Sequence, residues 1–296
     1  MLGLGEVKHL LERHGLEARR SLGQNFVADP NTVAHIARLA GVGPGDRVVE
    51  VGPGLGSLTL ALAASGARVL AVEKDRSLLP VLDEVLAAAS TPDEDEDEDE
   101  DEDWDAEPAA GDVRVVEGDA LVVDWSELLG NDPWTLVANL PYNVAVPVVM
   151  RVLAEAPQVR RLVVMVQLEV AERLCAAPGD RTIGIPSVKL AWYASARILT
   201  TVPPEVFVPR PRVQSAVVGI ERHGPPSTLV GPADVFPLVE QAYRQRRKML
   251  RSTLGRTIDV GAFDAAGIDP QLRPERLGLD DWVRLAEVLA GGGGAS

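Results

Sequence analysis

The run Asn139-Leu140-Pro141-Tyr142-Asn143 combines residue types that suit the binding of an aromatic amine. It follows an apolar stretch that is typical of a buried strand. Asn139 offers an uncharged amide acceptor, Leu140 a backbone carbonyl and Tyr142 a flat aromatic face. Pro141 fixes its own φ near about −65° and stiffens the loop. The run therefore predicts a site for the exocyclic amine of a ring such as adenine.

A glycine-rich turn, Gly52-Pro53-Gly54-Leu55-Gly56, follows a second apolar strand and precedes a predicted helix. Glycine allows the backbone to turn sharply and to approach a ligand closely. Gly52 and Gly54 are therefore candidate cofactor contacts. The turn alone does not identify the cofactor, because nicotinamide, flavin and S-adenosylmethionine sites all use it.

Two carboxylates end the neighbouring predicted strands. Glu73 is placed to accept both hydroxyls of a ribose. Asp119 is placed to accept a hydrogen bond from an adenine amine, although a lone carboxylate there is also typical of a helix N-cap. A dehydrogenase needs a proton-transfer group at the next strand end. That strand ends in Asn-Leu-Pro-Tyr with no histidine nearby, which favours S-adenosylmethionine over a nicotinamide cofactor.

Strand and helix patterns alternate from residue 47 onward, which indicates an α/β, Rossmann-like sheet that is mostly parallel. Two later runs without a long helix between them are expected to form an antiparallel edge, Leu190–Thr201 and Ser215–Arg222. The expected parallel strands are Arg47–Gly52, Arg68–Glu73, Val113–Asp119, Trp134–Asn139 and Arg161–Gln167, and the expected crossover helices are Ser57–Ala64, Ser77–Ala89 and Ala145–Ala154.

The chain of 296 residues is long enough for two domains, which we expect at 1–225 and 226–296. The second is expected to be all helical, with a flexible tail at Gly291–Gly294. Met1–Leu16 is typical of an amphipathic helix rather than a signal peptide, so a cytoplasmic protein is expected. No apolar stretch is long enough for a membrane span. The single cysteine predicts neither an internal disulfide nor a metal site.

The net charge of −15 depends on one segment, Asp93–Glu107, which holds thirteen of the 44 acidic residues. The remainder has 31 acidic and 29 basic residues and is close to neutral. Such a charge run predicts a disordered insertion, here at about 91–111. Because it joins a helix to the next strand, it is expected at the sheet end opposite the ligand site.

A basic stretch lies near the C-terminus, with six basic and no acidic residues between Gln241 and Arg256. Helical periodicity over Phe236–Leu254 predicts one helix with an apolar face and an adjacent basic stripe. Such a stripe suits RNA phosphates, although a solvated surface is the common alternative. The candidate RNA-binding residues are Arg244, Arg246, Arg247, Lys248 and Arg251.

Six ordered motifs make the chain resemble the small-subunit ribosomal RNA adenine dimethyltransferases, the kasugamycin-sensitivity family, over nearly its whole length. The residue after Asn139 is Leu rather than Ile, as in the small-subunit branch and unlike the related resistance methylases. The motifs are Leu22-Gly23-Gln24-Asn25-Phe26, Glu50–Gly56, Gly118-Asp119-Ala120, Asn139–Asn143, Val202–Pro209 and Gln245–Arg251.

The resemblance implies a role for individual positions. Asn25 and the backbone at Val27 would cover the cofactor, and the loop at Gly52 and Gly54 would contact its methionine part. Glu73 would bind the ribose, Asp119 the cofactor adenine, and Asn139 both cofactor and target base. Tyr142 and Phe207 would stack on either side of the target adenine. Isolated aromatic residues more often pack in the core, but both of these residues lie in proline-rich loops, which favours stacking on the base.

The resemblance also implies a class I methyltransferase fold and an activity. The activity would be transfer of methyl groups from S-adenosylmethionine to N6 of two adjacent adenosines near the 3′ end of 16S rRNA in the 30S particle. A monomer is expected. Three alternatives stay open: a ribosome-assembly binding factor, a resistance methylase acting on large-subunit RNA, and a nicotinamide-dependent oxidoreductase.

Overall fold

The computed structural model describes residues 1–19, 23–89 and 111–292, which pack as two compact units. The first unit comprises Met1–Leu168 and Ile198–Ile220, and the second comprises Glu169–Arg197 and the chain from Glu221 onward. Each unit is built from two separate segments of the sequence, whereas we expected a single boundary at residue 225. The expected assignment of methyl transfer to residues 1–225 and of RNA contact to residues 226–296 remains a proposal. The expected acidic insertion lies outside the described residues, apart from Gly111.

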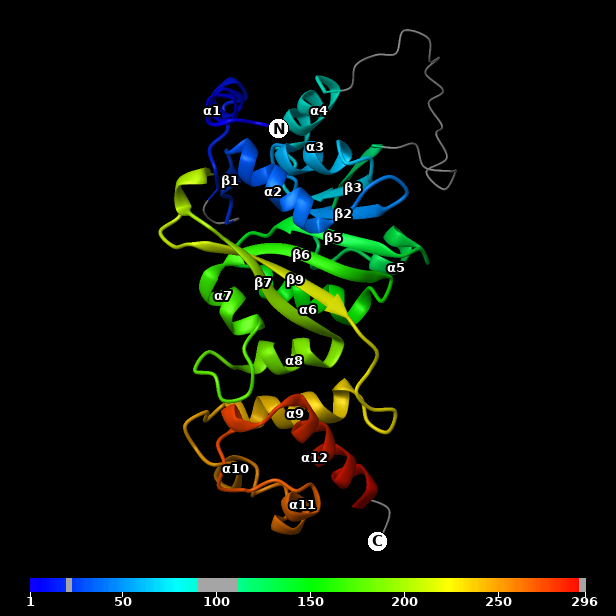
Figure 1. Cartoon of the computed structure of the whole chain (residues 1–296), viewed down its shortest axis with the longest axis vertical. Helices are drawn as coiled ribbons and strands as arrows, with labels where there is room; N and C mark the ends of the chain where they lie inside the picture. Colours follow the sequence, from blue (N-terminus) through cyan, green and yellow to red (C-terminus); the bar gives the residue numbers. More distant parts are fainter. Residues whose placement is uncertain (20–22, 90–110, 293–296) are drawn as a thin grey trace. The chain divides into compact units, whose positions relative to one another are not determined.

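Among the described residues, a seven-stranded sheet has the order β4-β3-β2-β5-β6-β9-β7 (Figure 1). Strands β2 to β6 pair in parallel, and antiparallel strands complete the sheet, so the predicted fold class is confirmed. The chain order reverses between β2 and β5, which creates the crevice where such sheets bind ligands. The strands are β2 (Arg47–Val51), β3 (Arg68–Glu73), β4 (Val113–Glu117), β5 (Trp134–Asn139), β6 (Val159–Gln167), β7 (Ala194–Val202) and β9 (Ser215–Arg222).

Helices cover both faces of this sheet (Figure 1). On one face, α2 and α3 bury Ile36 and Leu62 against β2 and β3 residues such as Val48 and Val69. On the other face, α6 packs against β6 and buries valines such as Val149. Burial of these side chains is the main stabilisation of the sheet. The helices of the first unit are α1 (Leu4–Arg13), α2 (Pro30–Ala40), α3 (Ser57–Ala63), α4 (Leu79–Ala87), α5 (Trp125–Leu129) and α6 (Ala145–Glu155).

A short antiparallel ribbon joins two segments that are far apart in the sequence. Strand β1 (Phe26–Val27) pairs with β8 (Phe207–Val208), so that Val27 lies opposite Phe207. The Ala28 N–H extends the ribbon by donating to the Val206 carbonyl at 2.7 Å. The ribbon therefore places the N-terminal segment beside the proline-rich link that precedes β9, a link that contains the short helix η2 (Pro204–Val206).

The second unit is helical around a core that includes Trp282, Phe263, Leu250 and Leu254. None of the helices in the described parts of the chain is long and apolar enough to cross a bilayer. Helix α7 (Leu168–Leu174) enters this unit, which further contains α8 (Ile185–Tyr193), α9 (Pro232–Tyr243), α10 (Leu250–Thr253), α11 (Val260–Ala265), η3 (Pro274–Arg276) and α12 (Leu279–Gly292).

The single helix predicted over Phe236–Leu254 is wrong, because α9 ends at Tyr243 and α10 begins at Leu250. A continuous helix would use the N–H groups of residues 250 and 251 on carbonyls four residues earlier. Instead, the Leu250 N–H donates to the Leu272 carbonyl at 2.8 Å, and the Arg251 N–H donates to the Pro270 carbonyl at 2.9 Å. Tertiary hydrogen bonds thus replace the helical ones.

Two element boundaries also differ from expectation. The strand expected over Leu190–Thr201 begins only at Ala194, because the preceding residues complete α8, where Trp192 packs in the second unit's core. Helix α12 continues to Gly292, so the first half of the expected glycine tail is helical. The amphipathic helix expected at the N-terminus is confirmed as α1, which buries Val7.

Candidate active site

A cavity of about 230 Å³ lies in the first unit, at the carboxyl ends of β2, β3, β4 and β5. This is the position at which a doubly wound sheet binds its ligands. The structure brings together there all the residues predicted to bind a cofactor, and three of the four predicted for catalysis. These lining residues are Asn25, Val27, Gly52, Gly54, Glu73, Asp119, Asn139, Leu140 and Tyr142.

The glycine turn forms one wall of the cavity and requires glycine for two reasons. Gly54 has φ of 61°, a left-handed conformation that side chains rarely adopt. A Cβ atom on Gly54 would also lie 3.0 Å from the Phe26 ring. Because glycine has no side chain, a ligand can approach the backbone of this turn closely. The Gly54 N–H donates to Glu73 Oε2 at 3.0 Å.

Glu73 is held rigidly at the end of β3. Its second oxygen, Oε1, accepts the Asp75 N–H at 2.8 Å, and only 5% of the residue is exposed. Burial raises the pKa of Glu73, and the backbone donors at Asp75 and Gly54 oppose that shift. Each carboxylate oxygen retains a further lone pair, so the group can accept two ligand hydroxyls without moving.

Glu50 is a second buried carboxyl in the cavity wall, and the site prediction did not include it. It lies within β2, is 1% exposed, and its Oε2 has no hydrogen-bond partner among the described residues. Desolvation raises the pKa of Glu50 to about 8, the Thr59 hydroxyl opposes the shift and the Glu73 carboxylate adds to it. An acidic residue inside the apolar run Val48–Val51 was the sequence signal for it.

Asp119 lies at the end of β4 and forms an ion pair across the cavity rim. Its Oδ2 accepts from Lys74 Nζ at 2.7 Å, and its Oδ1 accepts the Leu121 N–H at 2.9 Å. Partial burial opposes ionisation, but the Lys74 contacts and the Leu121 N–H lower the pKa of Asp119. Lys74 was not predicted, because a lone exposed lysine after Glu73 carries no sequence signal of its own.

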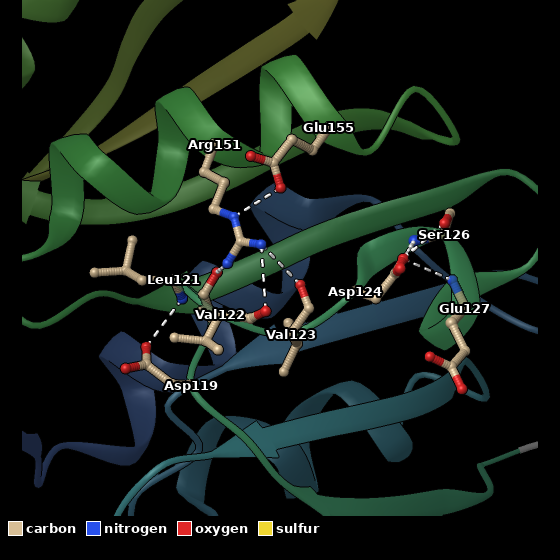
Figure 2. A network of polar contacts seen from close by, with 10 residues as sticks. Asp119, Leu121, Val122, Val123, Asp124, Ser126, Glu127, Arg151 and Glu155 are labelled. Carbon is tan, nitrogen blue, oxygen red and sulfur yellow. Dashed lines mark hydrogen bonds and ion pairs between the residues drawn. The ribbon is translucent and has the colours of Figure 1, made fainter.

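The loop that carries Asp119 is fixed by Arg151 from α6, as Figure 2 shows. The Arg151 guanidinium donates to the carbonyls of Ala120 at 3.3 Å, Val122 at 3.4 Å and Val123 at 3.0 Å. Its Nε donates to Glu155 Oε2 at 2.7 Å. Four bonds from one planar group therefore define the path of the loop next to the cavity.

Asn139 is oriented by the N-terminal segment. Its Nδ2 donates to the Asn25 carbonyl at 2.9 Å, and the Asn25 side chain donates to the Gly23 carbonyl at 3.0 Å. One amide N–H is thus bonded to the N-terminal segment, and the amide oxygen of this cavity-lining residue is left as an acceptor. No hydrogen bond to that oxygen, or to the Leu140 carbonyl, occurs within the described part of the chain.

The N-terminal segment is itself held at the end of β3. Gln24 Nε2 donates to Asp75 Oδ2 at 2.8 Å, and Arg19 Nη1 donates to Asp75 Oδ1 at 3.2 Å. Asp75 is only 6% exposed although it is charged, and it too was not predicted. The contacts explain how a loop with little regular structure can keep the Asn25 carbonyl at one position.

Tyr142 lines the cavity with a half-buried ring, whereas Phe207 does not line it. Phe207 is 3% exposed and packs in the core with Val27 and Met165. The physical reason is that the β1–β8 ribbon directs this large apolar ring inward. Tyr142 thus lines the cavity and Phe207 lies in the core, and stacking of both on the target base stays a proposal.

The predicted RNA-binding residues lie in the second unit. Arg246 is taken up internally, because its Nε donates to Glu275 Oε2 at 3.1 Å and its Nη2 to the Arg181 carbonyl. These bonds give Arg246 a structural role, and its expected role in RNA binding stays a prediction. The other four side chains are exposed and form no ion pair with any described residue: Arg244, Arg247, Lys248 and Arg251.

Known proteins resemble the chain over nearly its full length. A model of the ribosomal RNA adenine dimethylase family matches residues 15–291. A ribosomal RNA small subunit methyltransferase A from Kineococcus radiotolerans is 46% identical, over 100% of this chain and 94% of its own. The protein of that name from Cutibacterium acnes is 44% identical, over 100% of this chain and 97% of its own.

Solved structures share the fold. A dimethyladenosine transferase from Plasmodium falciparum superposes with a TM-score of 0.69 at 19% identity, covering 87% of this chain and 94% of that chain. The 23S rRNA methyltransferase ErmE gives 0.64 at 25% identity, covering 89% and 99%. Both likenesses cover most of the described chain.

Replacing Glu50 by Gln should change how stability depends on pH. The folded protein keeps the Glu50 proton up to about pH 8, whereas the unfolded chain releases it near 4.5. Wild-type stability therefore falls as pH rises between these values. Glu50→Gln cannot lose a proton, so its unfolding free energy relative to wild type should rise by on the order of 2–4 kcal/mol from pH 5 to pH 8.

Urea unfolding at several pH values measures this difference. The exposed Glu127→Gln replacement is the matched control and should show little pH-dependent difference from wild type. A Glu50→Gln difference that is constant with pH would contradict the proposed protonation.

Replacing Arg151 by Gln should loosen the loop that carries Asp119. The backbone carbonyls lose their charged donor, and such bonds contribute about 1.5–3 kcal/mol each at most. Hydrogen exchange at the Val122 and Val123 amides, which donate to the Asp119 carbonyl, should become at least about tenfold faster. Arg173→Gln, which removes an exposed pair with Glu169, serves as control. Unchanged exchange in Arg151→Gln would show that the loop does not depend on this side chain.

Proposed function

The chain belongs to the ribosomal RNA adenine dimethylase family, and we propose that its cavity binds S-adenosylmethionine and the target adenine together. The chain is an rRNA adenine dimethyltransferase that acts on the small subunit. The finer proposal is transfer to N6 of two adjacent adenosines near the 3′ end of 16S rRNA, within the 30S particle. The identities of 44–46% to proteins named for the small subunit support this over the large-subunit alternative.

The cavity residues fit S-adenosylmethionine. The buried Glu73 carboxylate has lone pairs left for two ribose hydroxyls, and the glycine turn leaves no Cβ between backbone and ligand. Asp119 would face the adenine amine, with Lys74 as its present partner. Asn25 and Val27 would lie against the cofactor from the N-terminal segment. When bound, this cofactor supplies an electrophilic methyl group on a positively charged sulfur.

The observation that carries the proposal is the pair of unoccupied acceptors at the end of β5. The Asn139 amide oxygen and the Leu140 carbonyl can each accept one hydrogen of the adenine amine. Such bonds favour a pyramidal nitrogen whose lone pair is more nucleophilic. Asn139 achieves this without a charge, and burying an unpaired carboxylate there would be costly.

The remaining catalytic contributions are positional. The Asn25 carbonyl keeps the Asn139 amide in the orientation that leaves its oxygen available. Orientation of this kind accounts for a large share of many rate enhancements. No strong base is required, because the amine proton becomes acidic once the methyl group has been transferred.

The target base must leave its stack to reach this pocket. The Tyr142 face would replace part of the lost stacking, worth roughly 1–3 kcal/mol. We also propose Phe207 as the second face; its ring would have to leave the core position described above.

The second unit would bind the RNA backbone. Its exposed basic residues Arg244, Arg247, Lys248 and Arg251 form the proposed surface, and phosphate contacts of this kind dominate affinity for RNA. We further propose that the enzyme acts as a monomer on the assembled 30S particle, and therefore in the cytoplasm.

Replacing Asn139 by Ala should abolish methyl transfer while leaving cofactor binding weakened but measurable. The variant loses the amide acceptor for the amine, whereas Glu73 and the glycine turn remain. Transfer of labelled methyl groups from S-adenosylmethionine to isolated 30S and 50S subunits measures activity, and calorimetry measures cofactor binding. Wild type should label 30S subunits alone.

The control for this variant is Asn131→Ala, which changes an exposed turn residue and should retain full activity. Wild-type activity in Asn139→Ala would contradict the proposed mechanism. Labelling of 50S in preference to 30S subunits would contradict the proposed substrate.

Replacing Arg247 or Lys248 by Gln should weaken RNA binding uniformly across sequences. Each removal should reduce the slope of log K against log salt by about 0.7–1, because one phosphate contact is lost. Arg246→Gln, whose side chain is bonded within the protein, should lower stability and leave the slope unchanged. The opposite pattern, a slope that responds to Arg246 alone, would contradict the proposed surface.

A further inference from the structure

We propose that Ser215 is a positioning residue that fixes the ring of Tyr142 for the target adenine. The Tyr142 Oη and Ser215 Oγ atoms are hydrogen-bonded at 2.6 Å, although 73 residues separate them in the sequence. The inference rests on the proposed function in one respect, that Tyr142 stacks on the base.

Ser215 is suited to this role because it is rigidly placed. It is the first residue of β9 and is 0% exposed. The carbonyl of the preceding residue, Gln214, accepts the N–H of Leu168, the residue directly after β6, at 2.9 Å. The serine hydroxyl therefore has a position defined by the sheet rather than by a mobile loop.

The other end of Tyr142 is also restrained. Pro141 stiffens the loop, and its carbonyl accepts the Val144 N–H at 3.0 Å, which closes a turn around Tyr142. Gly23 lies against the same turn, since a Cβ on Gly23 would be 3.3 Å from the Tyr142 N atom. With the backbone held by the turn and the hydroxyl held by Ser215, the long axis of the ring is fixed at both ends. Because a phenolic hydroxyl prefers to form its hydrogen bond in the plane of the ring, the Ser215 contact also restricts rotation of the ring about that axis.

A defined plane matters for this chemistry. A stacked base takes its orientation from the ring beneath it, and small misalignments of an attacking atom cost rate. Affinity for the polymer depends mainly on phosphate contacts. Loss of the Ser215 contact should therefore lower kcat and leave KM for RNA nearly unchanged.

Two variants remove the same hydrogen bond from opposite sides. Ser215→Ala and Tyr142→Phe should each lower kcat about threefold to tenfold, the range expected for one hydrogen bond. The double variant should be no slower than either single variant, because both remove one shared interaction. Calorimetry should give an unchanged Kd for S-adenosylmethionine in all three.

Fluorine NMR reads the ring directly and needs no RNA. The chain has three tyrosines, Tyr142, Tyr193 and Tyr243, so 3-fluorotyrosine labelling gives three resonances. Loss of one signal in Tyr142→Phe assigns Tyr142. In Ser215→Ala this signal should move toward that of free fluorotyrosine, while the other two stay in place.

Ser187→Ala is the matched control, because Ser187 is a buried serine of the second unit whose hydroxyl donates to the Arg173 carbonyl. It should lose stability without moving the Tyr142 signal or kcat. A Tyr142 signal unmoved in Ser215→Ala, additive kcat losses, or a change confined to stability would each overturn the proposal. Wild-type protein that transfers no methyl group would overturn the proposed function, whereas the fluorine shift would still decide whether Ser215 holds the ring.

Discussion

The hydrogen bond from the Asn139 side chain to the Asn25 carbonyl is the contact on which the rest of the site depends. Because the Asn139 amide nitrogen donates this bond, the amide oxygen is the atom that remains for a substrate. It also requires the N-terminal segment to lie over the end of β5. The Asp75 contacts to Gln24 and Arg19, and the β1–β8 ribbon, maintain that position. One N-terminal segment thus contributes to both the cofactor side and the base side of the cavity. A displacement of that segment would therefore alter the orientation of the Asn139 amide.

The charges of the cavity follow a consistent pattern. Glu50 and Glu73 are buried close together, and desolvation raises the pKa of both. Asp119, nearer the rim, has a lysine partner, and its pKa is lowered despite partial burial. The described residues that line the site thus include several carboxyl groups but one basic side chain, Lys74 at the rim. A positively charged ligand would favour the ionised form of the buried carboxyl groups, which is consistent with a sulfonium cofactor.

In the second unit, tertiary contacts give neighbouring basic residues different environments. The Arg246 side chain is bonded to Glu275 and to the Arg181 carbonyl, while Arg244 and Arg247 remain exposed. The break between α9 and α10 contributes to this sorting, because residues 244–249 follow a turn rather than a helical path. Spacing along an ideal helix therefore does not describe which of these side chains share a surface.

The sequence by itself determined the α/β class, the glycine turn, and the strand-end residues Glu73, Asp119 and Asn139 that meet at the cavity. These follow from local rules, since apolar period, glycine conformation and the common edge of parallel strands act over short distances. Only the tertiary structure decided the fate of Phe207, the break after Tyr243, the division of the arginines, and the contact of Ser215 with Tyr142. Each of these depends on a partner far away in the sequence. Local pattern does not encode such a partner, because burial and competing hydrogen bonds are settled only when distant segments pack together.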